Sequence, residues 1–155
     1  MAETIRFEEI YAAHATAIYR CLLAWSRDPA TAEELTAETF YRALTASDPV
    51  QAATARAYLI AIARNLFREQ FRNGWRREPI ENVDPPLALT NPDTNILLNT
   101  VLEAIAGLPE GQREPLVLFA QGGLTYDEIA EQLELPVTTV KLRIHRARQK
   151  LEKFR

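Results

Sequence analysis

Residues 125–150 read TYDEIAEQLELPVTTVKLRIHRARQK, and this stretch decides the fold predicted for the C-terminal part of the chain. Thr125 followed three residues later by Glu128 is the pattern of a capping box, which begins a helix. Pro136 favours the start of a second helix directly after it. A short helix, a tight turn and a long helix are therefore predicted. The apolar residues of the long helix recur every three or four positions and predict its buried face: Val137, Val140, Ile144, Ala147 and Leu151.

The other faces of the long helix are strongly basic. A helix-turn-helix whose second helix carries such a face is suited to the major groove of DNA. The alternative is an amphipathic surface helix with a solvated basic face, but it leaves the cap, the turn and the second apolar stripe in register unexplained. The basic residues and the histidine on these faces are Lys141, Arg143, His145, Arg146, Arg148 and Lys150.

The composition of the whole chain is that of a globular, helical protein. Of its 155 residues, 47% are hydrophobic and 25% are charged. Only five glycines, together with many Ala, Leu, Glu and Arg, favour an all-α fold. The single cysteine, Cys21, excludes an internal disulfide framework, and we expect it to be a buried small hydrophobe.

The sequence also bounds where the protein works. Its first ten residues are charged and lack the apolar core of a signal peptide. No apolar run reaches the length needed to span a membrane. We therefore expect a cytoplasmic protein without membrane insertion, which agrees with the lack of a disulfide framework.

The net charge of −3 conceals two basic segments in an acidic chain. Residues 56–77 carry a net +5 and residues 141–155 a net +6, whereas the rest of the chain carries −14. The acidity of the remainder argues against indiscriminate nucleic-acid binding. The two concentrated segments predict two separate phosphate-binding surfaces.

A proline-rich segment divides the chain. Pro79, Pro85, Pro86 and Pro92 predict an extended acidic linker over residues 78–92. The linker separates two small helical domains, at 1–77 and 93–155. In the first domain three helices are predicted, and their expected apolar faces are Phe7, Ile10, Tyr11, His14, Ile18, Cys21, Leu22 and Trp25, then Leu35, Phe40, Ala43 and Leu44, then Tyr58, Leu59, Ile62, Leu66, Phe67 and Phe71.

A ladder of arginines runs along the third of these helices. Arg64, Arg68, Arg72 and Arg76 repeat every four residues, and Asn65 lies next to the ladder. Such arginines on a surface helix can serve solubility alone. Four in register favour a nucleic-acid surface instead.

Three stretches, in this order, resemble the bacterial extracytoplasmic-function sigma factors, which consist of a region-two and a region-four domain. They are TAEELTAETFYRAL (31–44), ARAYLIAIARNLFREQFR (55–72) and LPEGQREPLVLFAQGGLTYDEIAEQLELPVTTVKLRIHRARQKL (108–151). The resemblance covers nearly the whole chain. It implies a protein that binds core RNA polymerase, directs it to specific promoters and assists promoter melting, with an anti-sigma factor as a further partner.

The same resemblance assigns roles in the first domain. The residues implied to dock on the polymerase are Glu34, Leu35, Glu38, Thr39 and Phe40, although Leu35 and Phe40 are equally well explained as core. Asn65 is implied to contact the melted non-template strand at the minus-ten element. A loop over 47–54, with Asp48 and Gln51, would hold a base flipped from the opening duplex, because melting exposes base faces that a polar loop can bind. The phosphates upstream would be held by Arg64, Arg68, Arg72, Arg76 and Arg77.

In the second domain the resemblance implies contacts with the duplex at the minus-thirty-five element. Lys141 and Arg146 can donate to guanine, and Leu142 can contact a thymine methyl group. Arg143 and Arg148 are expected to reach phosphates, and His145 to reach either a phosphate or a base. The full set of residues expected at this element is Thr138, Thr139, Lys141, Leu142, Arg143, His145, Arg146 and Arg148.

The chain departs from the family pattern at three positions. Ala37 replaces a Gln before the Glu-x-Phe motif, which removes one polar contact from the docking surface. Pro136 stands where a Ser commonly caps the recognition helix, and Leu142 replaces a common Ser. We expect Leu142 to change promoter preference more than overall affinity.

The linker is implied to enter the RNA-exit path of the polymerase, although a flexible tether explains its prolines equally well.

Two other classes of function fit the sequence less well. A helix-turn-helix regulator that binds an operator without polymerase usually dimerises, and it leaves the arginine ladder unexplained. An enzyme is disfavoured because the few Ser, His and Cys residues supply no catalytic triad, no phosphate-binding Gly loop and no metal-ligand spacing. We therefore expect no catalytic residue, no cofactor and no metal.

Overall fold

The computed structural model describes residues 6–46, 50–72 and 100–152, and its regular secondary structure in these ranges is entirely helical. The all-α fold class is thereby confirmed for this part of the chain. The chain divides into two compact units, and each is described by itself. The predicted linker at 78–92 lies outside the described residues, so the domain bounds that depend on it stay a prediction.

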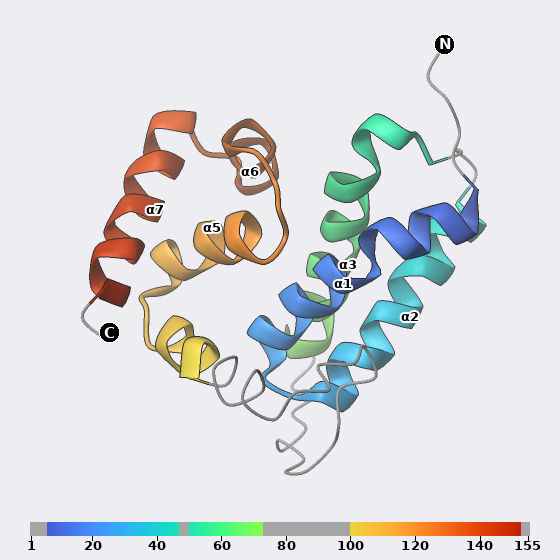
Figure 1. Cartoon of the computed structure of the whole chain (residues 1–155), viewed down its shortest axis with the longest axis horizontal. Coiled ribbons are helices and arrows are strands. Elements are labelled where there is room, and N and C mark those ends of the chain that lie inside the picture. Colours follow the sequence, from blue (N-terminus) through green and yellow to red (C-terminus); the bar gives the residue numbers. More distant parts are fainter. Residues whose placement is uncertain (1–5, 47–49, 73–99, 153–155) are drawn as a thin grey trace. The chain divides into compact units, whose positions relative to one another are not determined.

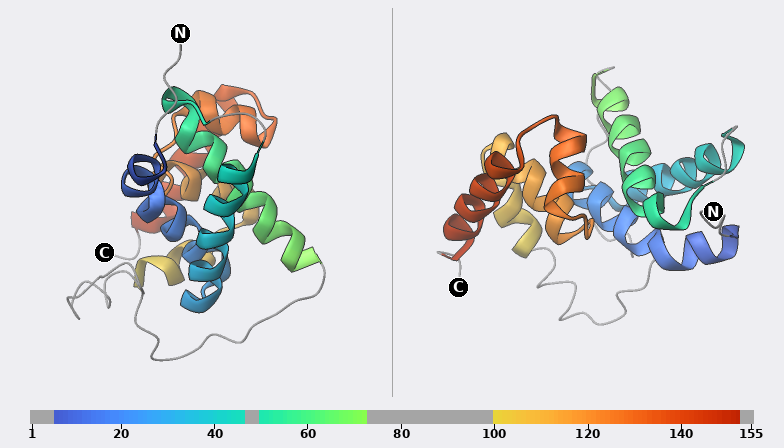
Figure 2. Two further views of the ribbon diagram at one scale, coloured as in Figure 1. Left: turned by 90° about the vertical axis from the view of Figure 1, so that its right-hand side faces the viewer. Right: turned by 90° about the horizontal axis from the view of Figure 1, so that it is seen from above.

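Within its described residues, 6–46 and 50–72, the first unit has three packed helices and a short 3-10 turn (Figure 1). They are α1 (Phe7–Ser26), α2 (Pro29–Thr45), the 3-10 turn (Ala52–Thr54) and α3 (Ala55–Arg72). Each of the three helices contacts the other two, and Figure 2 shows the same arrangement from two further sides. The side chains at the centre of this core are no more than 1% exposed: Ile18, Leu22, Leu35, Leu59 and Ile60.

A two-residue turn joins α1 to α2 and is held by a buried carboxylate. Arg27 ends α1 in the left-handed region, with φ 58°, and donates its N–H to the carbonyl of Leu23. Asp28, which is only 1% exposed, then caps α2. Its carboxylate accepts from the N–H of Ala30 at 3.3 Å and from the hydroxyl of Thr31 at 2.6 Å. An N-cap of this kind satisfies donors at the helix start that would otherwise lack partners.

A polar contact ties the start of α3 to α1. Arg56 donates from Nε to Nδ1 of His14 at 3.2 Å and from Nη2 to the carbonyl of Ala13 at 3.0 Å. Burial, and to a smaller extent the nearby Arg56 charge, lowers the pKa of His14 from its ordinary 6.5. His14 is therefore the neutral acceptor of this contact. Cys21 is fully buried, as predicted.

The predicted apolar faces are only partly correct. Nine of the eighteen predicted residues are buried and four are half-buried, but four are substantially exposed: Phe7 (39%), Tyr11 (43%), Leu44 (53%) and Tyr58 (37%). The side chain of Phe71 lies outside the described part of the chain. Phe7 and Tyr11 instead pack at the edge of the core, with their ring centroids 6.4 and 5.1 Å from that of Phe40. Periodicity identifies one face of a helix, but it does not say how far along that face the neighbouring helices extend.

The second unit contains the predicted helix-turn-helix. A helix over 100–106 precedes α5 (Glu110–Ala120), α6 (Tyr126–Leu133) and α7 (Val137–Glu152), and α7 packs on both α5 and α6 (Figure 1). The capping box is confirmed: the Thr125 hydroxyl accepts from the backbone N–H of Glu128 at 3.1 Å, and the Glu128 carboxylate accepts from the backbone N–H of Thr125 at 2.9 Å.

The turn between α6 and α7 is again tight. Glu134 lies in the left-handed region, with φ 56°, and the carbonyl of Pro136 accepts the first hydrogen bonds of α7. The predicted stripe on α7 is confirmed at its centre, where Val140, Ile144 and Ala147 are at most 1% exposed. Val137 and Leu151, at the two ends of the stripe, are half-buried.

Removal of the cap between α1 and α2 should destabilise the first unit. We expect Asp28→Ala to lower its free energy of unfolding by about 1–3 kcal/mol, because the substitution removes the N-cap and leaves the buried Thr31 hydroxyl without its acceptor. Urea unfolding followed by Trp25 fluorescence, in a Trp75→Phe background, measures this change. Asp28→Asn is the matched control and should cost less, because Asn is an equally good N-cap. Equal losses in the two variants would contradict this role of the carboxylate.

The His14 contact should make the stability of the first unit depend on pH. The pKa of His14 is lower in the folded state, so the unfolded chain takes up this proton first as the pH falls below about 6.5. This contribution to stability is complete above that pH and is lost as the pH falls toward the folded pKa. We expect His14→Gln, which keeps an acceptor for Arg56, to show a smaller loss than the parent between pH 7.5 and 5.5. Parallel urea-unfolding results across this range would disprove the assignment.

Candidate nucleic-acid and protein interfaces

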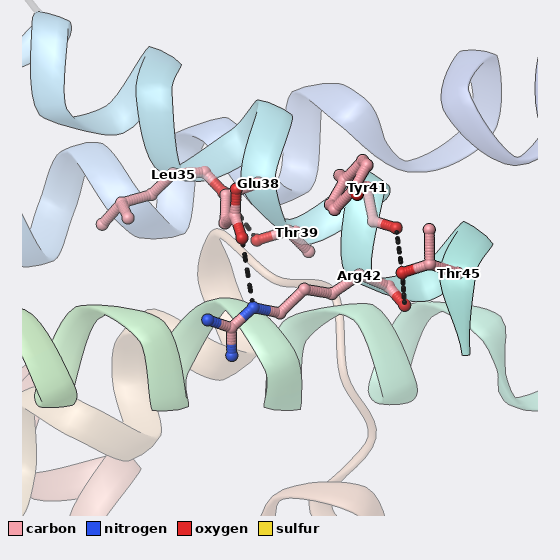
Figure 3. Close-up of polar contacts among 6 residues, drawn as sticks. All are labelled: Leu35, Glu38, Thr39, Tyr41, Arg42 and Thr45. Carbon is pink, nitrogen blue, oxygen red and sulfur yellow. Dashed lines mark hydrogen bonds and ion pairs between the residues drawn. The ribbon is translucent and has the colours of Figure 1, made fainter. Parts of the chain in front are cut away.

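The residues predicted to dock on the polymerase lie on α2, and the structure separates them into two groups. Leu35, Thr39 and Phe40 are at most 3% exposed. The hydroxyl of Thr39 donates to the carbonyl of Leu35 at 2.7 Å (Figure 3). These three side chains support the helix from inside, and a partner cannot reach them in this conformation. Glu34 is exposed and Glu38 is partly exposed, so the accessible chemistry of this surface is acidic.

Glu38 forms an ion pair with a residue of its own helix. Its carboxylate lies 3.2 Å from Nε of Arg42, and both side chains are about half exposed, at 44% and 52% (Figure 3). Tyr41 is the residue of this surface that the sequence analysis missed: its side chain is 63% exposed. The repeat of 3.6 residues per turn places Tyr41 on the same face as Glu34 and Glu38. That periodicity, applied to the polar face as well as to the apolar one, is the signal that identifies it.

The predicted minus-ten surface is described only in part. On α3, Asn65 and Arg68 are exposed, and Arg64 is half-buried. Gln51 is half-buried just before the 3-10 turn, and its side-chain oxygen has no hydrogen-bond partner among the described residues. The remaining predicted residues fall elsewhere: Arg72 belongs to α3, but its side chain is outside the described part of the chain, as are Asp48, Arg76 and Arg77 entirely.

The exposed side of α7 has a middle and two edges. Successive residues of a helix are rotated by about 100°. On this basis the middle of the face carries three exposed residues: Thr138, Leu142 and His145. Leu142 is 47% exposed. Lys141 and Arg148 follow one edge. The other edge carries Arg146, which is exposed, and Thr139 and Arg143, which are half-buried.

The half-buried Arg143 rests against α5. Its guanidinium lies beside Gly111, where an added Cβ would be 3.4 Å from Nη1. This is an ordinary van der Waals distance, so the guanidinium packs against this part of α5.

Lys141 and Arg148 each lie over an aromatic ring of another helix. The ammonium nitrogen of Lys141 is 5.7 Å from the ring centroid of Tyr126, and the guanidinium carbon of Arg148 is 5.0 Å from that of Phe119. Phe119 and Tyr126 stack on each other, with centroids 5.0 Å apart and planes only 7° from parallel. These two rings are called the aromatic pair below. This pair was not predicted from the sequence, because its two rings come from different helices, α5 and α6.

Two kinds of feature are absent from residues 6–46, 50–72 and 100–152. No helix there is both long enough and apolar enough to cross a membrane. In the same ranges, no cluster of three or more His, Cys, Asp or Glu side chains is arranged to hold a metal ion.

Comparison with known families matches both units. Residues 10–77 match Sigma-70 region 2, and residues 98–151 match Sigma-70 region 4. The region-2 match falls on the helices of the first unit, and the region-4 match falls on those of the second.

Characterised relatives carry the same family name. The ECF RNA polymerase sigma factor EcfG of Rhodopseudomonas palustris is 35% identical over 126 residues, which cover 77% of this chain and 68% of EcfG. SigE of Mycolicibacterium smegmatis is 31% identical, over 96% of this chain but only 61%, less than two thirds, of its own length. SigM of Bacillus subtilis is 29% identical over 94% of this chain and 92% of SigM.

Solved structures agree in fold. CnrH, solved in complex with the cytosolic domain of CnrY, is 28% identical with a TM-score of 0.69, over 96% of this chain and 86% of that one. The sigma factor RpoE of Bartonella quintana, solved with the anti-sigma factor NepR, is 22% identical with a TM-score of 0.67, over 95% and 94% of the two chains. The two region matches, the identity with EcfG and this shared helical architecture lead to one conclusion: the chain belongs to the extracytoplasmic-function (ECF) RNA polymerase sigma factors.

Proposed function

We propose that this chain binds core RNA polymerase through its first unit, recognises a two-part promoter, and assists opening of the duplex at the downstream part. The observation that carries the proposal is the occurrence of both Sigma-70 regions, in order, on one chain. The charge distribution supports it, because the basic segment 56–77 falls in the region-2 match and most of the basic segment 141–155 falls in the region-4 match. The polymerase performs the chemistry in this proposal, and the chain is not itself an enzyme.

The polymerase contact is assigned to the acidic face of α2. Glu34 and Glu38 supply the charge, and the exposed Tyr41 adds an aromatic surface beside them. Leu35, Thr39 and Phe40 have an indirect role, because their burial fixes the rotation of α2 and thereby the direction of the acidic face. In the predicted motif, Glu34 and Glu38 would thus contact the polymerase, whereas the buried residues support the helix.

The downstream promoter element is assigned to α3 and the segment before it. Asn65 would contact the melted strand, and Arg64 and Arg68 the phosphates beside it. The predicted loop residues Asp48 and Gln51 would hold a flipped base, and Arg72, Arg76 and Arg77 would extend the phosphate contact. Binding of unstacked bases offsets part of the free energy needed to open the duplex.

The upstream promoter element is assigned to α7. The middle of its exposed face, with Thr138, Leu142 and His145, is suited to base edges, and the flanking cations are suited to phosphates on the two sides of the groove. Arg146 can in addition donate two hydrogen bonds to a guanine. Lys141, which the sequence also suggested as a guanine donor, lies on an edge of the face, and we assign it to the DNA backbone instead. Leu142 adds an apolar contact where the family commonly has a Ser.

The cellular context is part of the same proposal. We place the protein in the cytoplasm, where the polymerase works. CnrH was solved with a bound domain of another protein, CnrY. We propose that an anti-sigma factor likewise binds this chain and covers its polymerase-binding or DNA-binding surfaces.

Run-off transcription tests the proposal directly. Purified core polymerase, this chain and a library of genomic fragments would be combined, and the 5′ ends of the transcripts sequenced. Discrete starts preceded by a shared two-part motif are the expected result. No stimulation of the polymerase, together with sequence-specific duplex binding by the chain alone, would instead establish an operator-binding regulator.

A charge reversal on α2 tests the docking surface. We expect Glu38→Lys to weaken competition for core polymerase by about tenfold, because it places a cation in an interface that is complementary to an acid. Glu33→Lys makes the same charge change on another side of α2 and is the matched control. Competition against a labelled sigma factor measures both variants. Equal competition by Glu38→Lys and the parent would remove Glu38 from the interface.

An alanine substitution on α7 separates base reading from phosphate contact. Arg146→Ala should lower discrimination at one base pair of the upstream element by roughly 1–3 kcal/mol, because a bidentate contact to guanine is lost. Lys150→Ala, on the same helix, should weaken binding to all sequences alike. Affinities for a set of single-base variants of the recovered promoter measure this. A uniform loss in Arg146→Ala would make Arg146 a phosphate contact.

A further inference from the structure

The aromatic pair and the two cations next to it form one continuous cluster drawn from three helices. Phe119 lies near the end of α5, and Tyr126 is the first residue of α6. Both cations come from α7, two helical turns apart on the same edge. The ring-to-ring distance of 5.0 Å and the cation-to-ring distances of 5.0 and 5.7 Å are all within the range of favourable contact.

The rings themselves are held in place by the fold. Tyr126 directly follows Thr125, whose side chain closes the capping box with Glu128, so the backbone at the start of α6 is fixed. Phe119 directly follows Leu118, which is completely buried in the core. The rings therefore provide a rigid support beside α7, whereas Lys and Arg side chains are by themselves among the most flexible in a protein.

Contact with a ring leaves both cations available to a ligand. Lys141 and Arg148 are exposed, and within the described part of the chain neither forms an ion pair with a carboxylate. An ammonium group has three N–H donors and a guanidinium group has five, so the donors that point away from the ring remain free. A long side chain that is already ordered loses less entropy when it binds.

We propose that Phe119 and Tyr126 are positioning residues for DNA binding: the aromatic pair holds Lys141 and Arg148 along one edge of α7 in the conformation that reaches the DNA backbone. This proposal rests on the proposed function of α7. It extends that function to two residues, on α5 and α6, that do not themselves touch the DNA. It also distinguishes the two edges of α7, because Arg143 on the other flank rests on Gly111 rather than on a ring.

A double-mutant cycle on the full-length chain tests the proposal. The variants are Tyr126→Leu, Lys141→Met and the double substitution, with Tyr126→Phe as the matched control that keeps the ring. The probe is a pool of random-sequence 30-base-pair duplexes, titrated by fluorescence anisotropy at several KCl concentrations. Thermal unfolding of each variant shows whether α5, α6 and α7 remain folded.

The expected results are specific to a positioning role. Lys141→Met should weaken binding and lower the salt slope by about one, as for the loss of one phosphate contact. Tyr126→Leu should weaken binding by about two- to tenfold, since an unordered side chain must be immobilised on binding. Tyr126→Phe should match the parent. In the Lys141→Met background, Tyr126→Leu should have no further effect.

Other results would overturn the proposal. If Tyr126→Leu weakens binding equally with and without Lys141, the ring does not act through the lysine, and the role of α7 in DNA binding still stands. Stronger binding by Tyr126→Leu would mean that the ring withholds the cation from DNA. If Lys141→Met changes nothing, the proposed DNA contact of this lysine is wrong, and the positioning role falls with it.

The second half of the cluster gives an independent test if Tyr126→Leu unfolds the second unit. Phe119→Leu combined with Arg148→Met forms the equivalent cycle, and Phe119→Tyr keeps the ring. Coupling between Phe119 and Arg148 in DNA affinity is the expected outcome. Additive effects of these two substitutions would overturn the proposal on their own.

Discussion

Each unit depends on a helix that ends in a left-handed residue and is followed almost at once by the next helix. Arg27 (φ 58°) precedes Asp28 and Pro29, and Glu134 (φ 56°) precedes Leu135 and Pro136. Residues with side chains pay a conformational cost in this region, so packing on both sides of the turn must hold them there. Because the turns leave little freedom, the second helix of each pair has a fixed rotation and a fixed solvent-facing side.

The functional surfaces follow from that fixed rotation. On α7, burial of Val140, Ile144 and Ala147 leaves the remaining sides of the helix to solvent, and these sides are basic. On α2, burial of Leu35, Thr39 and Phe40 directs Glu34 and Glu38 outward. The residues of one family motif can therefore have two different roles. Its exposed members are available for contacts, and its core members orient the exposed ones.

Much of the fold was predictable because its signals are local. The capping box at Thr125 and the stripe on α7 depend on neighbours within a few residues, and both were predicted correctly. The exposure of Phe7, Leu44 and Tyr58 was not predictable, since it depends on where a neighbouring helix stops. The accessible part of the docking motif and the rings beneath Lys141 and Arg148 likewise depend on contacts between helices that are distant in the sequence.

The burial of the single cysteine has a practical consequence. Burial raises the pKa of the Cys21 thiol to about 12, although the Arg56 charge opposes this, and the side chain is inaccessible to solvent. The reactive thiolate is thus nearly absent at neutral pH while the first unit stays folded. A thiol reagent would label the chain at one site only, and only during opening of this three-helix core. The rate of alkylation therefore reports how often α1, α2 and α3 separate.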